Sequence, residues 1–410
     1  MRVLVVAHYA SAKRGGEALL PLQYFRILRS RHLDAYLVTH EDARDELEKL
    51  FPDDSNYIYY VKGNWIHSLL RAGGNRLQGV AERILWFFNQ LQTEFLLAQL
   101  SRQLAKDLEI DIVHQPISVS PKMPSLMFAL GVPVVIGPMN GNINYPPGMQ
   151  LRQSLLSKLL LQLGRLFSSN FLNFLFPGKR RAQILLVAND RTRQALPRGA
   201  EGEVLTLVEN GVDLSIWKHH HSVIDTSRLA IRFIYIGRLV GWKGLDLLLE
   251  SFQEVVSKVE ASLEIVGDGE LRQQLENQVA EMGLSTKVRF LGWLSHEECA
   301  EKLSDADVFV LPSLLECGGA VVLEAMAMGL PVIASNWGGP ADYVDSSCGI
   351  LVDPVSRDVF VRDFTQAMLK LAQFPDLRLE MGRAGKERVH KHFDWEKKVD
   401  QILDIYQKKC

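Results

Sequence analysis

The sequence predicts an α/β protein built from two doubly wound domains. Short β-branched runs alternate with helical stretches from one end of the chain to the other. That alternation is typical of a parallel sheet covered by helices on both faces. The series occurs twice, and 410 residues suit two domains of about 200 residues each better than one hydrophobic core.

The first half predicts one sheet. Val3–Ala7 is a continuous apolar run, as expected of a buried parallel strand, and a helix from about Gly16 to Arg29 follows it. The remaining strands of this half are expected at Ala35–Thr39, Tyr57–Val61, Ile112–His114, Val132–Ile136, Ile184–Ala188 and Val204–Val208.

The second half repeats the rhythm more cleanly. A polar, turn-rich stretch between Ala188 and Arg232 separates the halves, as an exposed connection should. We place an N-terminal domain at residues 1–200 and a C-terminal domain at residues 201–390. Its strands are expected at Phe233–Ile236, Ser262–Val266, Val288–Leu291, Val308–Leu311, Val332–Ala334 and Ile350–Val352.

Composition limits the classes of function. The formal charge of −2 gives no electrostatic argument for nucleic acid as a partner. Four widely spaced cysteines are expected to be free thiols in a reducing compartment. The N-terminus lacks the apolar stretch of an export signal, and no run reaches the length of a membrane span. We therefore expect a cytoplasmic protein.

Residues 151–181 break the pattern. They carry six basic residues and no Asp or Glu, and leucines recur at helical spacing on one face. This composition suits a basic amphipathic helix at an anionic membrane surface, and equally a helix packed on its own domain. The sequence leaves both interpretations open.

The densest cluster of candidate site residues begins after the strand Val308–Leu311. The loop from Ser313 to Gly319 carries Glu316 and a Gly-Gly pair, and a helix is expected from there to about Met328. Ligands of open α/β sheets bind at the carboxyl ends of strands, and a helix N-terminus favours an anion. Gly318, Gly319 and Ala320 therefore predict a phosphate seat, with Glu324 two helical turns beyond Glu316.

A second element, Gly237 to Gly244, directly follows the strand Phe233–Ile236. Arg238 and Lys243 are expected to project from a glycine-bounded turn toward the same strand ends. Two cations there would neutralise the charge that develops on a leaving diphosphate.

These two elements resemble the E-x7-E motif and phosphate-binding turn of the retaining family 4 glycosyltransferases. The resemblance implies the GT-B fold, in which two Rossmann-like domains face each other across a cleft and a C-terminal helix, here residues 391–410, crosses back to the N-terminal domain. It implies that Glu324 holds the donor ribose, Glu316 the sugar, and Arg238 and Lys243 the diphosphate. One departure is Cys317, since the family usually has Glu-Gly-Phe-Gly in this loop.

The resemblance also implies a donor substrate, a UDP-, GDP- or ADP-sugar, an acceptor that is a saccharide or lipid-linked, and no cofactor. Gly15 and Gly16 would face the donor phosphates, His114 the transferred sugar, and Gly267 the nucleotide base. A lone histidine is as readily a packing residue. Two alternatives stay open, a sugar-nucleotide epimerase of the same fold and a catalytically silent binding subunit.

We expect no metal site. Asp305 and Asp307 form an Asp-x-Asp pattern, but two residues of one strand make a poor cage without further ligands. His219, His220 and His221 are adjacent, so they do not face one way, and a solvated loop is the favoured interpretation.

Overall fold

The computed structural model describes residues 1–13, 15–63, 80–117, 119–149, 171–217 and 230–409. It divides the chain into two compact units. Unit 1 comprises Met1–Asn142, Ser154–Glu209 and Val399–Cys410, and unit 2 comprises Ile143–Gln153 and Asn210–Lys398.

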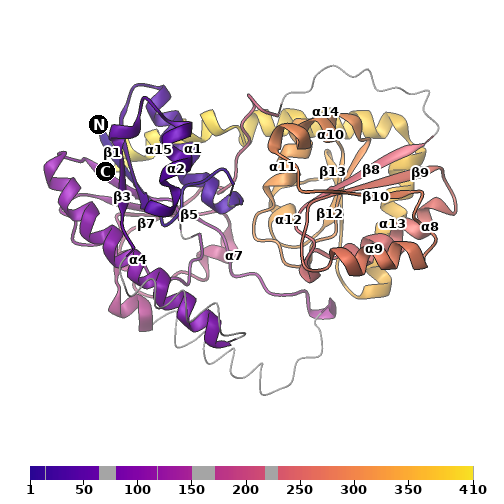
Figure 1. The fold of residues 1–410 in the computed structure, drawn as a ribbon, viewed down its shortest axis with the longest axis horizontal. Helices are drawn as coiled ribbons and strands as arrows, with labels where there is room; N and C mark the ends of the chain where they lie inside the picture. Colours follow the sequence, from indigo (N-terminus) through magenta and orange to yellow (C-terminus); the bar gives the residue numbers. More distant parts are fainter. Residues whose placement is uncertain (14, 64–79, 118, 150–170, 218–229, 410) are drawn as a thin grey trace. The chain divides into compact units, whose positions relative to one another are not determined.

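Unit 1 contains a seven-stranded sheet in the order β3-β2-β1-β4-β5-β6-β7 (Figure 1). Every pairing within it is parallel, and the reversal of strand order beside β1 is that of Rossmann-like sheets. The strands are β1 (Arg2–Val6), β2 (Asp34–His40), β3 (Ile58–Val61), β4 (Ile112–Gln115), β5 (Val134–Met139), β6 (Ile184–Val187) and β7 (Glu203–Thr206).

Helices cover both faces of this sheet. Helix α4 (Val80–Asp107) packs on the face that carries Leu4 and Val6 of β1. The opposite face carries His114, whose ring meets Tyr24 of α1 (Gly16–Ser30) and Tyr406 of α15 (Trp395–Lys409). The shorter helices of the unit are η1 (Glu41–Ala43), α2 (Arg44–Leu50), η2 (Ser55–Tyr57), α6 (Gly178–Arg181) and α7 (Asp190–Arg193).

Unit 2 contains a six-stranded parallel sheet in the order β10-β9-β8-β11-β12-β13. The burial of Phe233–Tyr235 in β8 and the full burial of β11 and β12 place these strands in the core. The strands are β8 (Ile231–Ile236), β9 (Ala261–Val266), β10 (Val288–Gly292), β11 (Val308–Leu311), β12 (Val332–Ser335) and β13 (Gly349–Val352).

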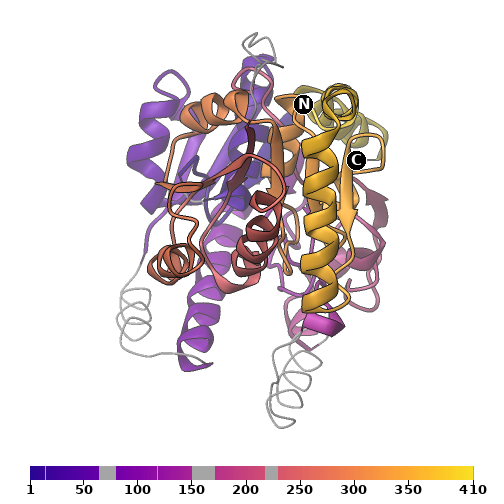
Figure 2. The ribbon, with the colours of Figure 1, turned by 90° about the vertical axis from the view of Figure 1, so that its right-hand side faces the viewer.

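Four helices of unit 2 pack as two pairs. Helix α8 (Leu245–Val256) lies beside α13 (Arg357–Gln373), the long vertical helix at the front of Figure 2, and α11 (Ala320–Ala327) lies beside α14 (Pro375–His392). The others are η3 (Pro147–Met149), η4 (Gly241–Lys243), α9 (Arg272–Glu281), α10 (His296–Asp305) and α12 (Gly339–Tyr343).

The predicted α/β fold with two Rossmann-like sheets is confirmed, since each of the thirteen expected strands overlaps an observed one. The chain divides between Glu209 and Asn210 rather than at residue 200, because β7 is still paired with β6 of the first sheet. Residues 143–153 group with unit 2, although they follow a strand of unit 1.

Two further sequence predictions concern contact with a membrane and the histidine cluster. No helix among the described residues is long and apolar enough to cross a membrane. The histidines at 219–221 and residues 150–170, which form most of the basic amphipathic stretch, lie outside the described residues.

Candidate functional site

The loop after β11 is the one for which the sequence predicts a phosphate site. It runs from Pro312 to Gly319, where the backbone takes a left-handed conformation with φ of 86° before α11 begins. A Cβ on Gly319 would lie 3.0 Å from the Cγ atom of Glu316, so glycine allows the glutamate to fold over the helix start. The backbone at the start of α11 therefore lies beside the Glu316 side chain.

Lys243 and Glu316 meet at this seat. Their side chains form an ion pair and are only 13% and 15% exposed. The loops that carry them touch through backbone: Leu314 N–H donates to the Trp242 carbonyl at 2.8 Å, and a Cβ on Gly244 would lie 2.4 Å from the Pro312 carbonyl oxygen. The structure thus brings together two groups that lie 73 residues apart in the sequence.

Arg238 lies at the same edge of the sheet as Lys243. Its side chain is exposed, and its guanidinium lies 5.9 Å from the centre of the Trp242 ring. Gly237 and Gly267 adjoin each other, because a Cβ on Gly267 would lie 2.0 Å from the Gly237 carbonyl oxygen. The ends of β8 and β9 therefore approach more closely than side chains would permit, and the edge exposes backbone.

Glu324 is partly buried on α11, two turns beyond Glu316. Removal of its carboxyl from water raises its pKa from the ordinary value to about 7. The nearby Cys299 thiol of α10 has a pKa raised to about 12, first by burial and then by the charge of Glu324. A carboxyl with this pKa changes its charge within the physiological range, and the thiol beside it stays neutral there.

The Asp305–Asp307 pattern has a structural role. The Asp307 carboxylate accepts a 2.8 Å hydrogen bond from the Arg232 amide at the start of β8. Within the described ranges, no three His, Cys, Asp or Glu side chains are grouped so that they could hold a metal ion.

His114 lies on β4 of unit 1 and is fully buried. Its Nε2 atom contacts the Gly137 carbonyl oxygen at 2.6 Å and its Nδ1 atom contacts the Tyr406 hydroxyl at 2.6 Å. Burial lowers the pKa of His114 to about 4, so the ring is neutral, with Nε2–H donating and Nδ1 accepting. Both ring nitrogens have hydrogen-bond partners within unit 1. This favours the packing interpretation over contact with a sugar.

Gly15 and Gly16 form the start of α1 and are exposed. Gly15 has φ of 93°, and a Cβ on either residue would meet no atom within 4 Å. Their backbone is therefore open to a ligand, as the resemblance implies, but their geometry alone identifies none.

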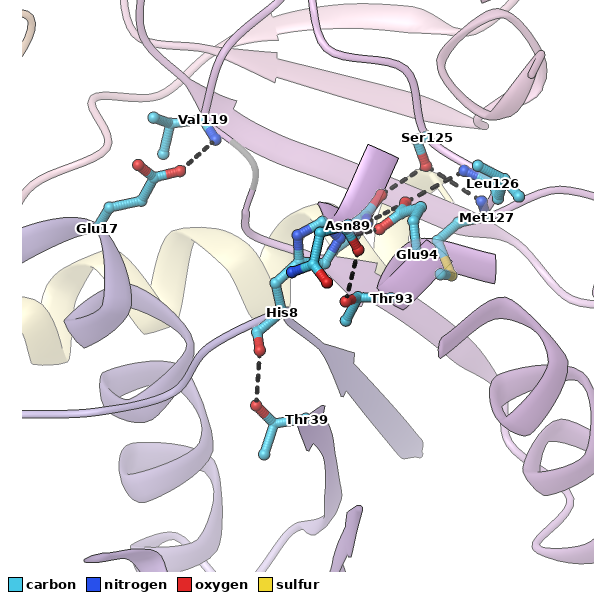
Figure 3. A network of polar contacts seen from close by, with 11 residues as sticks. His8, Glu17, Thr39, Asn89, Thr93, Glu94, Val119, Ser125, Leu126 and Met127 are labelled. Carbon is cyan, nitrogen blue, oxygen red and sulfur yellow. Dashed lines mark hydrogen bonds and ion pairs between the residues drawn. The ribbon is translucent and has the colours of Figure 1, made fainter. Parts of the chain in front are cut away.

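Sequence reasoning missed a buried polar network at the carboxyl end of β1 and β4 (Figure 3). His8 forms an ion pair with Glu94 of α4, and the same carboxylate accepts hydrogen bonds from Gln115 Nε2 at 2.7 Å and from the Leu126 amide at 3.1 Å. Burial alone would raise the pKa of Glu94, but the charge of His8 and these donors outweigh it and lower the pKa. The sequence did offer one signal for this network, because His8 directly follows the apolar strand Val3–Ala7.

The network continues to a buried lysine. Lys179 of α6 donates to the Ser120 carbonyl at 2.5 Å, and burial lowers its pKa to about 7 although Glu94 and Glu17 oppose the change. Glu17 in turn accepts a 3.1 Å hydrogen bond from the Val119 amide. Acidic and basic side chains thus hold the loop after β4 against α1, α4 and α6.

Comparison with known sequences finds one family model that spans the residues predicted for the donor site. Residues 228–388 match the family described as glycosyl transferases group 1. A GDP-mannose-dependent monoacylated α-(1-6)-phosphatidylinositol monomannoside mannosyltransferase of Corynebacterium glutamicum is 32% identical over 178 residues, which cover 42% of this chain and 45% of the relative. A D-inositol 3-phosphate glycosyltransferase of Geodermatophilus obscurus is 33% identical over 240 residues, covering 54% and 52%. The chain thus matches about half the length of these relatives.

Solved structures match the fold over the full chain. A sucrose-phosphate synthase of Thermosynechococcus elongatus has a TM-score of 0.68 at 19% identity and covers 100% of this chain and 99% of its own. Anabaena HepE in complex with UDP has a TM-score of 0.66 at 17% identity, covering 99% and 100%. The protein therefore has the GT-B fold, and its residues 228–388 are similar to the glycosyl transferases group 1.

Proposed function

We propose that the protein transfers a sugar, with retention of anomeric configuration, from a nucleoside-diphosphate sugar to a saccharide or lipid-linked acceptor. The observation that carries this proposal is the convergence of the Lys243 ammonium, the Glu316 carboxylate and the Gly318–Gly319 backbone at the start of α11. A cation and the backbone amides at a helix start suit a diphosphate, and a carboxylate beside them suits the hydroxyl groups of a sugar.

The Lys243–Glu316 pair gives each group a role when a donor binds. The donor diphosphate competes for the Lys243 ammonium, and Glu316 is then available to accept hydrogen bonds from the sugar. Arg238 is exposed at the same edge and adds a second positive charge. Both cations act most strongly when the diphosphate leaves, because its negative charge grows as the bond to the sugar breaks.

The proposed substitution occurs at the anomeric carbon. The bond from this carbon to the diphosphate oxygen breaks, and a bond to the acceptor hydroxyl oxygen forms on the same face. The acceptor proton passes to the leaving phosphate oxygen, so no additional base is needed. Glu324 would accept hydrogen bonds from the ribose hydroxyls, and the Gly237–Gly267 edge would contact the base. A UDP complex of one structural neighbour and the GDP-mannose in the name of one relative support a nucleotide donor.

The proposed reaction needs no metal ion, since Arg238, Lys243 and the loop amides carry the positive charge that a metal would otherwise supply. Activity should therefore persist in EDTA. Complete loss in the chelator, followed by recovery with magnesium or manganese, would contradict this part of the proposal.

A lipid-linked acceptor would be met at a membrane. One relative's name includes a phosphatidylinositol mannoside, and we include in the proposal that the basic stretch 151–181 docks on an anionic bilayer. Within its described part, Phe171, Phe174 and Leu175 are 49%, 67% and 50% exposed. Apolar side chains at this level of exposure are suited to insertion at a lipid surface.

Incubation with radiolabelled UDP-, GDP- and ADP-sugars, without acceptor, tests the proposal. A transferase slowly hydrolyses its donor to free sugar and nucleoside diphosphate. An isomerised donor would instead identify an epimerase, and a donor that binds but stays unchanged would identify a binding subunit. Arg238→Ala is the matched variant in which hydrolysis should cease.

A further inference from the structure

A segment that follows a strand of unit 1 is built into the donor half of the protein. Residues Ile143–Met149, which we name the strap, come after β5 but group with unit 2. Pro146 within the strap is buried. A Cβ on Gly148 would lie 1.5 Å from the Val355 carbonyl oxygen, so the far end of the strap is in backbone contact with the loop after β13.

The near end of the strap contacts the loop after β12. The indole Nε1–H of Trp337 donates to the Asn144 carbonyl at 2.8 Å. A Cβ on Gly338 would lie 2.4 Å from the Cδ1 atom of Ile143. One hydrogen bond and one apolar contact thus fix the Trp337–Gly339 turn against the strap.

The same turn supports the phosphate seat from the other side. Gly339 N–H donates to the Glu316 carbonyl at 2.8 Å. A Cβ on Gly338 would lie 2.1 Å from that carbonyl oxygen, and a Cβ on Gly339 would lie 1.8 Å from the Gly318 carbonyl oxygen. Because this contact is between backbones with no intervening side chains, a shift of the turn displaces the Glu316–Gly319 loop directly.

We propose that the strap is part of the donor site, with Ile143 and Trp337 as positioning residues that hold the Glu316–Gly319 loop in place for the sugar-bearing phosphate. This inference rests on the proposed function, in which that loop contacts the diphosphate and the sugar, and Glu324, farther along α11, binds the ribose. The strap therefore affects recognition of the diphosphate more than recognition of the nucleoside.

Paired nucleotides separate this role from a general effect on folding. Binding of UDP and UMP, or of GDP and GMP if the wild-type protein prefers guanine, is measured by calorimetry for wild type, Trp337→Phe and Ile143→Ala. Trp337→Phe removes the N–H donor and keeps an aromatic side chain, although the phenyl ring is smaller than the indole. Ile143→Val, which keeps the branched side chain, is the conservative rescue. Phe374→Ala is the matched control, because Phe374 is 55% exposed and lies between α13 and α14, outside the strap and the Glu316–Gly319 loop.

Trp337→Phe and Ile143→Ala should each weaken diphosphate binding about fivefold, the effect of losing one ordinary hydrogen bond or a comparable packing contact. Monophosphate binding and the melting temperature should stay near wild type, as should every property of Phe374→Ala. Equal weakening of both nucleotides, or no weakening of either, would overturn the inference. If the wild-type protein binds no nucleoside diphosphate at all, the proposed function fails instead.

Discussion

The raised pKa of Glu324 predicts that donor binding strengthens as the pH rises through 7. Burial holds the pKa of this carboxyl at about 7, so a large share of it is protonated in the free protein at neutral pH. A protonated carboxyl accepts hydrogen bonds poorly, whereas the carboxylate accepts one from each ribose hydroxyl. The nucleotide therefore favours the ionised form, and binding is linked to loss of a proton.

The size of the effect follows from the ionised fraction. With a pKa of about 7, about one tenth of Glu324 is ionised at pH 6 and about nine tenths at pH 8. The dissociation constant for a nucleoside diphosphate should thus fall about ninefold over this range. The Cys299 thiol contributes no titration there, because its pKa is raised to about 12.

Calorimetric titration with UDP or GDP between pH 6 and 8 measures this dependence. The nucleotide's own terminal phosphate also ionises near pH 6, so Glu324→Gln provides the baseline. This variant should keep the part of the pH dependence that belongs to the nucleotide and lose the rest. A 2′-deoxynucleotide should show a smaller difference between wild type and variant. Identical pH profiles for wild type and Glu324→Gln would refute the reasoning.

Three further predictions concern the other site residues. Arg238→Ala and Lys243→Ala should each leave the protein folded but lower kcat, because each removes about 2–4 kcal/mol of transition-state stabilisation. Near wild-type rates for both variants would contradict the donor assignment. Tyr406→Phe, which leaves the buried His114 nitrogen without a donor, should cost about 1–3 kcal/mol of unfolding free energy without changing kcat; a lower kcat at unchanged stability would restore a role for His114 in the reaction. Wild-type protein should co-sediment with phosphatidylglycerol vesicles, and joint replacement of Arg152, Lys158 and Arg165 by Glu should abolish this, whereas the same change at Lys258, Arg289 and Arg362 should not.

The strands could be predicted because their signal is local. Apolar runs bounded by turn residues identified every strand, and the largest discrepancy has a physical cause. The sequence predicts a strand at Val132–Ile136, since Gly137-Pro138 resembles a turn, but β5 continues to Met139. Its pairing with β6 shifts register between Ile136 and Met139, and this irregularity accommodates the glycine and proline within the strand.

The arrangement of the residues proposed for the donor site was predictable for the same reason. Glu316, the glycine pair and Glu324 lie on one loop and the helix after it, so sequence spacing fixes their arrangement. Contacts between segments that are distant in sequence produce no such local pattern. His8 and Glu94 are 86 residues apart, Asn144 and Trp337 are 193 apart, and His114 and Tyr406 are 292 apart. Each pair depends on topology that no local pattern encodes.

The family match covers the local part of the predicted site but not the strap. The matched stretch, residues 228–388, contains the whole predicted phosphate seat, and nucleotide diphosphates present the same chemistry in every donor. The strap lies outside that stretch and yet contacts the turn that supports Glu316 and Gly318. A change in the strap can therefore alter how the diphosphate and the attached sugar are held while every residue of the shared motif stays in place.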